Sequence, residues 1–265
     1  MKLFKPLLLT IYSIILILLS SCKDTPEEDL LNFTLIEKNS YFIDSYDGLS
    51  VYRDNKSRKP LNGYYVVGDK FKKWEEFKVK NGLLNGLNIV FHSNGEIFSK
   101  SNYQNGTLNG EEKIYSLSGK LKTINKYKNG IRYGKSLSYF ENGQLKSESK
   151  IEDEKVIESV SYDLIGNIVS QIFIDDGKKI TQYVQGGKVF SEHISSTYDS
   201  FEATKFYNQD GSLKLYLQML EDGDNFYIIE RNEAGDEIKR TNAKTNPEEL
   251  LKYQQFIEGT KLLLN

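Results

Sequence analysis

Hydrophobic and polar residues alternate along most of this chain, with the period of two that places successive side chains on opposite faces of a β-strand. In one clear segment the apolar or aromatic positions are Leu87, Ile89, Phe91, Ile97 and Tyr103, and most positions between them are Lys, Ser or Asn. The same parity recurs in the segments that follow. The pattern predicts strands that share one moderately apolar face and one polar face.

The alternating segments repeat with a period of about 24 residues, and this internal repeat is the strongest signal in the chain. Three glycine columns keep this spacing: Gly82, Gly106 and Gly130; Gly86, Gly110 and Gly134; and Gly95, Gly119 and Gly143. The pattern weakens after residue 150, but Gly187, Gly211 and Gly235 are again 24 residues apart. We therefore expect about eight units between residues 50 and 242.

Each unit is predicted to form a β-hairpin, because two alternating segments flank a short turn rich in glycine and asparagine. Asn-Gly is favoured in type I′ turns, in which both central residues take a positive φ. The dipeptide occurs eight times, at 62–63, 81–82, 85–86, 94–95, 105–106, 109–110, 129–130 and 142–143. Gly106 and Gly130 are therefore expected at positive-φ turn positions of a β-meander.

The predicted core is thin, since many small polar residues share the parity of the apolar positions. They are Ser99, Ser101, Thr123, Asn125, Ser147 and Ser149. An extended sheet stabilised by contacts between neighbouring units fits this composition better than a closed globule. The predicted fold is all-β: an elongated antiparallel meander of β-hairpin repeats in a single sheet, followed by a C-terminal α-helix.

The helix is predicted for residues 246–264, where the alternation stops. Asn246 suits the N-cap, Pro247 suits the first helical position, and Glu248 and Glu249 lie at the positive end of the helix dipole. Apolar residues follow at helical spacing. We expect this helix to cap the last hairpin.

Residues 1–21 have the features of a secretory signal peptide. Lys2 and Lys5 form a basic start, and the apolar run that follows is shorter than the roughly 20 residues that span a bilayer. The run ends in Leu19-Ser20-Ser21-Cys22, which resembles the lipobox. In lipoproteins a diacylglycerol is attached to this cysteine and the peptidase cuts before it. The resemblance implies a lipid on Cys22, a membrane as partner, and a location in the cell envelope, on the outer membrane, at its periplasmic or surface face.

Residues 22–32 are predicted to form an acidic, flexible tether. Two interpretations of this tether stay open: a solvated linker, or an export signal, since it resembles the acidic signals that some Gram-negative bacteria place after the lipid cysteine. The remaining chain divides into irregular N-terminal strands with a first repeat (33–76), regular repeats (77–150) and degenerate repeats (151–242).

Two consecutive units carry a family resemblance. The first is Tyr103-Gln-Asn-Gly-Thr-Leu-Asn-Gly-Glu-Glu-Lys-Ile-Tyr-Ser-Leu-Ser-Gly-Lys-Leu, and the second is Tyr127-Lys-Asn-Gly-Ile-Arg-Tyr-Gly-Lys-Ser-Leu-Ser-Tyr-Phe-Glu-Asn-Gly-Gln-Leu. Both resemble the MORN-repeat variant of many bacterial proteins, clearly over 77–150 and weakly over 50–76 and 151–242. Such proteins are commonly labelled antitoxins of the YwqK type. MORN repeats elsewhere serve as scaffolds and as lipid- or protein-contacting modules, so the resemblance implies a non-catalytic role.

Composition and motifs favour no enzymatic or nucleic-acid function. The 35 Lys and Arg residues nearly balance 37 Asp and Glu residues, whereas a nucleic-acid binder needs a basic surface. No zinc-protease, nucleophile-elbow or phosphate-loop motif occurs. His92 and His193 are isolated, and the acidic pairs Asp175-Asp176 and Glu221-Asp222 suit turns better than metal binding. We expect no catalytic residues, cofactor, metal site or nucleic-acid partner.

Two function classes remain open. The first is a lipid-anchored structural or binding module that contacts a protein or an envelope component. The second is an antitoxin or immunity protein that neutralises a toxin in the periplasm or at the surface. For binding, the candidate strip consists of aromatic residues expected in rows on one face, namely Phe91, Tyr103, Tyr115, Tyr127 and Tyr139. Alternatively, these rings pack on one another and on Leu121 and Leu145 as core.

Overall fold

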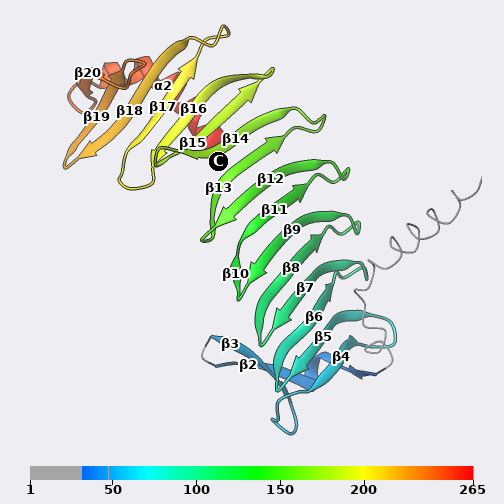
Figure 1. Ribbon diagram of the computed structural model, residues 1–265. Coiled ribbons are helices and arrows are strands. Elements are labelled where there is room, and N and C mark those ends of the chain that lie inside the picture. Colours follow the sequence, from blue (N-terminus) through cyan, green and yellow to red (C-terminus); the bar gives the residue numbers. More distant parts are fainter. Residues whose placement is uncertain (1–31, 47, 265) are drawn as a thin grey trace, which may run out of the picture.

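The computed structural model describes residues 32–46 and 48–264, which form a long, twisted β-sheet followed by a helix (Figure 1). Cys22 and the predicted signal peptide lie outside the described residues. No helix in the described part of the chain is long and apolar enough to cross a membrane. The elements are β1 (Phe33–Ile36), the 3-10 turn η2 (Lys38–Ser40), β2 (Tyr41–Tyr46), β3 (Leu49–Asp54), β4 (Gly63–Gly68), β5 (Lys73–Lys80), β6 (Leu83–Phe91), β7 (Ile97–Gln104), β8 (Thr107–Tyr115), β9 (Leu121–Lys128), β10 (Ile131–Arg132), β11 (Gly134–Tyr139), β12 (Leu145–Glu152), β13 (Lys155–Tyr162), β14 (Ile168–Asp175), β15 (Lys178–Gln185), β16 (Lys188–Ser196), β17 (Glu202–Tyr207), β18 (Leu213–Asp222), β19 (Asn225–Arg231), β20 (Glu237–Asn242) and α2 (Pro247–Leu264).

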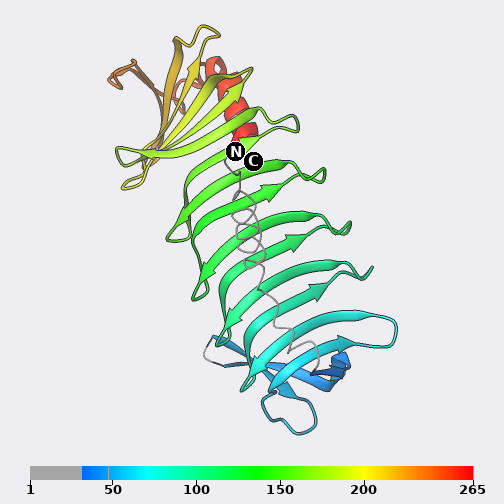
Figure 2. The same ribbon diagram turned by 45° about the vertical axis from the view of Figure 1, so that its right-hand side comes forward.

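Within the described residues, 18 strands share one sheet. From β4 onward each strand pairs antiparallel with the next along the chain, with one exception at β10. Both the two-residue β10 and the following β11 pair with β9. β1 runs parallel to β4 at one edge, and β2 and β3 form a separate hairpin. The strands follow one another along the molecule in Figure 2. These pairings confirm the predicted single-sheet meander with a C-terminal helix.

Tight turns between units use three of the eight Asn-Gly dipeptides. Asn81, Asn105 and Asn129 have φ near +50°, and the glycines after them have φ of +79°, +83° and +82°, as type I′ turns require. The expected positive φ at Gly106 and Gly130 is therefore confirmed. The prediction is wrong for 85–86 and 109–110, which lie inside β6 and β8. There the glycines, with φ near +120°, sit where the pairing shifts register.

Five-residue loops close the other end of each regular hairpin. The N–H of the first loop residue donates to the carbonyl of the fifth, from His92 to Glu96 at 2.7 Å and from Ser116 to Lys120 at 2.8 Å. The same bond begins at Phe140, Asp163, Asn208 and Asn232. Three loops of the degenerate repeats, at 163–167, 208–212 and 232–236, thus keep the geometry of the regular ones, whereas a two-residue turn at Gly186 and Gly187 joins β15 to β16.

A β-bulge beside these loops decides which face the side chains occupy. Phe91 pairs with Ile97, but Val90 pairs with Ser99, so β7 contains one extra residue at this point. Register shifts follow the same pattern before Tyr115, Tyr139, Tyr162, Tyr207 and Arg231. One inserted residue moves every later side chain of the strand to the opposite face.

Cross-strand pairing therefore defines a face that continues along the whole sheet, called here the capped face. Its central row of paired residues is Tyr65, Phe77, Asn88, Ser101, Glu112, Asn125, Ser136, Ser149, Ser159, Ile172, Thr181, His193, Thr204, Leu217, Glu230 and Lys239. The row is apolar at its first end, polar in the middle, and mixed at the far end.

The β2–β3 hairpin covers the first end of the capped face. Tyr41 and Tyr52 pack on Phe77, with ring centroids 5.5 and 4.7 Å from that ring. Phe77 is 0% exposed and lies at the centre of a cluster with Leu61, Val67, Val79 and Leu84. This cluster is an apolar core for the N-terminal end of the sheet.

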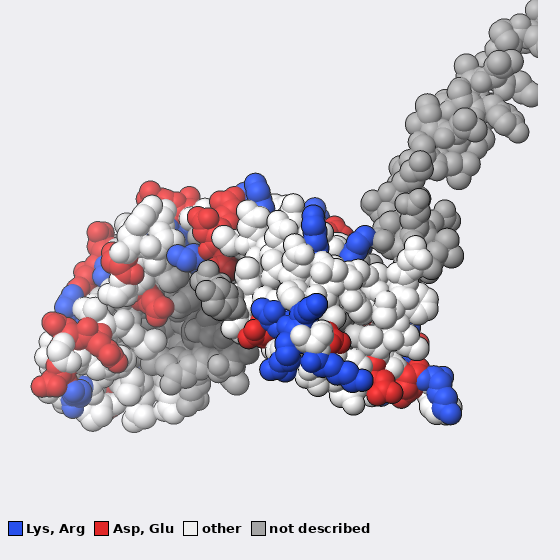
Figure 3. All heavy atoms as spheres, turned by 90° about the horizontal axis from the view of Figure 1, so that it is seen from below, with Lys and Arg blue, Asp and Glu red and all other residues white. Residues whose placement is uncertain are grey.

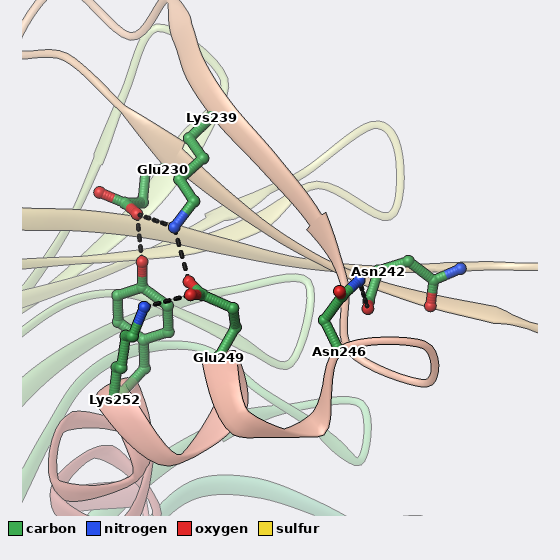
Figure 4. Close-up of polar contacts among 7 residues, drawn as sticks. Glu230, Lys239, Asn242, Asn246, Glu249 and Lys252 are labelled. Atoms are coloured by element: carbon green, nitrogen blue, oxygen red, sulfur yellow. Dashed lines mark hydrogen bonds and ion pairs between the residues drawn. The ribbon is translucent and has the colours of Figure 1, made fainter.

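The helix α2 covers the other end of the same face (Figure 2). Leu250 and Tyr253 pack against Leu217, Ile228 and Ala243. Polar contacts hold the first turns of the helix in place: Lys239 binds Glu249 at 2.6 Å, and Tyr253 donates to Glu230 (Figure 4). Burial and the neighbouring Glu230 raise the pKa of Tyr253 to about 12, so this phenol keeps its proton.

Asn246 precedes the helix, as the N-cap prediction places it, but its side chain acts as a donor. Its Nδ2 donates to the carbonyl of Asn242 at 3.2 Å (Figure 4). Its own carbonyl accepts from the N–H of Glu249 at 3.1 Å. The side chain thus fixes the bend between β20 and α2.

Charges at the N-terminal end are mixed in sign. Figure 3 views the molecule from this end and shows Lys and Arg side chains gathered in one group, with Asp and Glu side chains nearby. Several cations here lie over aromatic rings, as for Lys38 over Trp74 (5.5 Å) and Arg58 over Phe42 (4.1 Å). These contacts order the cations at the end of the sheet.

Candidate binding surface

The middle of the capped face is lined by small polar side chains in two neighbouring rows. We call this surface the polar strip; it consists of Ser99, Ser101, Thr123, Asn125, Ser136, Ser138, Ser147, Ser149, Ser159, Ser161 and Ser170. Figures 1 and 2 show the β2–β3 hairpin at one end of the sheet and α2 at the other. Neither of them reaches β8–β12, so no described element outside the sheet covers this part of the strip.

Hydroxyl groups within the polar strip bond to one another across the strands. Ser138 and Ser147 share a hydrogen bond of 2.8 Å, and so do Ser149 and Ser159. Each hydroxyl has one donor and two acceptor positions, so these pairs keep capacity for further bonds. Cross-strand polar pairs of this kind stabilise a sheet by about 0.2–1 kcal/mol each.

Glu112 places an acid within the strip, between Ser101 and Asn125. Its Oε2 accepts from Tyr127 at 3.2 Å and from Asn125 at 3.3 Å, and Asn125 in turn accepts from Ser136 at 2.8 Å. Burial, followed by the charge of Glu112, raises the pKa of Tyr127 and of Tyr103. Both phenols therefore stay protonated at neutral pH, and that of Tyr127 donates to Glu112.

Two hydroxyl groups on this face are buried without a partner. They are Thr123 Oγ1 and Ser191 Oγ, which lack a hydrogen bond within the described part of the chain. Ser191 pairs with Tyr183 and Phe206 in the second row of the capped face, and it is 1% exposed. An unsatisfied buried hydroxyl is unfavourable by about 1–3 kcal/mol, so this face holds hydrogen-bonding capacity that the fold itself does not use.

The five aromatic residues predicted to form a binding surface do not share a face, and that part of the prediction is wrong. Tyr103 lies two residues from Ser101 and Tyr127 two from Asn125, which places both rings on the capped face. Phe91, Tyr115 and Tyr139 each lie three residues from a member of the central row, and therefore occupy the opposite face. A contribution of these residues to binding stays a prediction.

The alternative expectation, that the five rings pack on one another, is also wrong, since within the described residues no ring pair joins two of them. A 24-residue step moves the chain by two strands, from β6 to β8 and then to β11. Two strands separate equivalent rings by about 10 Å. Instead, Tyr103 packs on the N-terminal cluster, while Phe91 lies beneath the ammonium of Lys73 at 5.0 Å.

The predicted division into an apolar and a polar face is wrong as well. The opposite face mixes both types along one paired row: Ile89, Lys100, Lys113, Ile124, Leu137 and Glu148. The bulges explain the difference, because they bring serines and asparagines of successive strands onto the capped face. The recurring Ser-x-Ser pattern in β7, β11, β12 and β13 is the sequence signal that could have located the polar strip.

The histidines make structural contacts. His92 Nε2 lies 3.2 Å from the carbonyl of Tyr115, and its ring contacts Phe98 edge-on at 5.1 Å. His193 Nδ1 lies 3.4 Å from Thr204 Oγ1, and burial lowers its pKa, which favours the neutral ring. Within the described residues no cluster of three His, Cys, Asp or Glu side chains could hold a metal ion.

Three consecutive segments match the family model described as MORN repeat variant: residues 84–105, 108–129 and 132–153. They correspond to the hairpins β6–β7, β8–β9 and β11–β12. This match confirms the resemblance for these three units and indicates a structural or binding module. The lipoprotein and antitoxin interpretations stay predictions.

Two further comparisons add nothing to this assignment. No curated protein matches the chain. Among solved structures, a "putative 6-phosphogluconolactonase" from Bacteroides fragilis is 10% identical, over 77% of this chain and 96% of that chain, with a TM-score of 0.16. At that score the likeness carries no argument.

Proposed function

We propose that this chain is a lipid-anchored, non-catalytic binding module of the cell envelope, whose polar strip contacts a protein or another envelope component. One observation supports the binding role above others. A single face runs the length of the sheet, and a hairpin and a helix cover its ends. In its middle Ser99, Ser101 and Asn125 are buried, whereas the serines of β11–β14 in the strip are half-buried and keep spare hydrogen-bonding capacity. Small side chains let a partner approach the sheet closely, and hydroxyl groups serve as both donors and acceptors.

The anchor is tested by the variant Cys22→Ser. Without the thiol no lipid can be attached, so we expect the variant to lose labelling by a fatty-acid analogue and to leave the membrane fraction. Washing the membranes with high salt removes proteins held by charge alone. A variant that stays with salt-washed membranes as fully as the natural chain would rule out the lipid anchor.

The polar strip is tested by a matched pair of tryptophan variants in β12. Ser149→Trp places a bulky ring in the centre of the strip, whereas Lys150→Trp places the same ring on the opposite face of the same strand. With each variant as bait in an envelope extract, we expect Ser149→Trp to lose the captured component and Lys150→Trp to retain it. Equal capture by both variants would refute the strip as the contact surface, and capture of a toxin would favour the antitoxin alternative.

A further inference from the structure

A second candidate site lies on the other face of the sheet, near its C-terminal end. Here β16, β17 and the loop before β18 border a cleft of about 430 Å³ that is open to solvent. It is lined by Lys188, Val189, Glu192, Tyr207, Asp210 and Gly211. Glu192 adjoins His193 and Tyr207 adjoins Phe206, and those neighbours belong to the capped face. The cleft therefore opens on the side opposite the polar strip and α2.

Two neighbouring turns build the rim of the cleft. Gly186 and Gly187 form a tight turn with φ of +59° and +76°, which places Lys188 at the start of β16. The ammonium of Lys188 donates to the carbonyl of Gln209 at 2.7 Å, and this bond ties the turn to the loop before β18. Asp210 follows in that loop and accepts from the N–H and the hydroxyl of Ser212, at 2.9 and 2.6 Å.

The floor of the cleft is an oriented carboxylate beside an aromatic ring. Glu192 accepts from Gln182 Nε2 through Oε1 at 2.7 Å and from the Tyr207 hydroxyl through Oε2 at 2.6 Å. Burial and the bond to Glu192 raise the pKa of Tyr207, so its proton stays on the phenol. A carboxylate offers about four acceptor positions, and these two bonds leave roughly half of them for a ligand.

Cations near Glu192 are engaged elsewhere. Lys205 is its direct cross-strand neighbour, but its ammonium lies over the ring of Tyr216 at 4.9 Å. Lys188 is directed to Gln209 at the rim. Neither ammonium group is therefore paired with the carboxylate of Glu192, which remains able to accept hydrogen bonds from a ligand.

The chemistry of the lining selects one class of ligand. Two carboxylates accept hydrogen bonds, one ammonium donates them, and the Tyr207 ring with Val189 offers an apolar surface. Two carboxylates and one ammonium give the lining a net negative charge, which disfavours an anion. A simple cation, in turn, has no acceptor for the donor group of Lys188. A neutral sugar satisfies the whole set, because each hydroxyl donates and accepts and its C–H faces pack on an aromatic ring. The volume lies in the usual range of small-ligand sites, about 300–1,000 Å³.

We propose that this cleft binds a neutral saccharide unit of a glycan, with Glu192 and Asp210 accepting from sugar hydroxyl groups and Tyr207 packing on the ring. The site does not depend on the polar strip, so loss of partner capture by Ser149→Trp leaves this proposal unaffected.

The test is calorimetric titration of the full chain, held in a detergent without a sugar head group, with maltose, lactose and N,N′-diacetylchitobiose. We expect saturable binding of at least one of these neutral disaccharides. Glu192→Gln should weaken it by about tenfold or more, the effect of losing a hydrogen bond to a charged group. Tyr207→Phe keeps the ring but removes the bond that orients Glu192, so it should weaken binding by a smaller factor.

The matched control is Tyr127→Phe, which removes a similar bond from a tyrosine to a glutamate, but on the capped face. It should leave saccharide affinity unchanged. The proposal is overturned if none of the three disaccharides binds, or if Glu192→Gln and Tyr207→Phe, folded by circular dichroism, bind as well as the natural chain. Tighter binding of glucosamine or glucose 6-phosphate would also overturn it, because the site would then select a charged ligand.

Discussion

Phe77→Ala is expected to lower the free energy of unfolding of the N-terminal end of the sheet by about 3–5 kcal/mol, as for other buried aromatic truncations. Phe77 is 0% exposed, and the rings of Tyr41, Tyr52 and Tyr65 all lie against it. Removing it leaves a cavity between β5 and the β2–β3 hairpin. The hairpin belongs to a separate sheet, so it depends on this packing for its position.

The measurement is urea unfolding followed by the fluorescence of Trp74. This residue is the chain's one tryptophan and packs against the same cluster, so it reports on this end of a sheet whose parts can unfold separately. Phe98→Ala is the control, since that ring is 41% exposed on the opposite face of β7. Similar losses in both variants would show that the cluster does not hold the hairpin in place.

Gly82→Ala is expected to destabilise the same region by about 2–5 kcal/mol, the sum of a backbone contribution and a steric contribution. The first is the left-handed backbone, since φ is +79° and a side chain there is unfavourable by about 1–2 kcal/mol. The second is steric, because a Cβ atom would lie 2.9 Å from the carbonyl oxygen of Tyr52 and 2.7 Å from Val51. That carbonyl cannot easily move, since Tyr52 also bonds Gly82 through its own N–H at 2.7 Å. Overpacking of this kind adds about 1–3 kcal/mol.

Gly130→Ala separates the two parts. Gly130 occupies the same position of an equivalent Asn-Gly turn, with φ of +82°, and nothing lies within 4 Å of the Cβ that alanine would add. It should therefore lose only the backbone part, about 1–2 kcal/mol. The comparison uses the unfolding midpoint of each variant in urea. Equal losses would mean that the turn at Gly82 does not depend on close contact with the N-terminal hairpin.

The period of the chain was sufficient to predict the sheet. Glycine and Asn-Gly columns mark turns that depend on local backbone angles, and alternation marks strands, so hairpins and their order follow from short-range chemistry. The C-terminal helix was predicted for the same reason, since Pro247 and the acids after it favour a helix start without any tertiary contact.

Which face each side chain occupies was decided by tertiary structure. Phe91 and Tyr103 have the same parity in the sequence, yet the extra residue in β7 places them on opposite faces. A bulge is a property of the pairing between two strands, and counting along one strand cannot reveal it. The polar strip, which depends on these bulges, was missed for that reason.

The sequence by itself thus determined the repeat, the hairpins and the helix, because each depends on backbone preferences within a few residues. Only the tertiary structure decided that the β2–β3 hairpin and α2 cover the same face, and that Glu192 and Tyr207 share a cleft. The contacts of Tyr207 with Glu192, Tyr52 with Phe77 and Tyr253 with Glu230 join residues 15 or more positions apart. They depend on the register that the bulges set between strands. They also depend on which apolar surface of the sheet the β2–β3 hairpin and α2 each pack against.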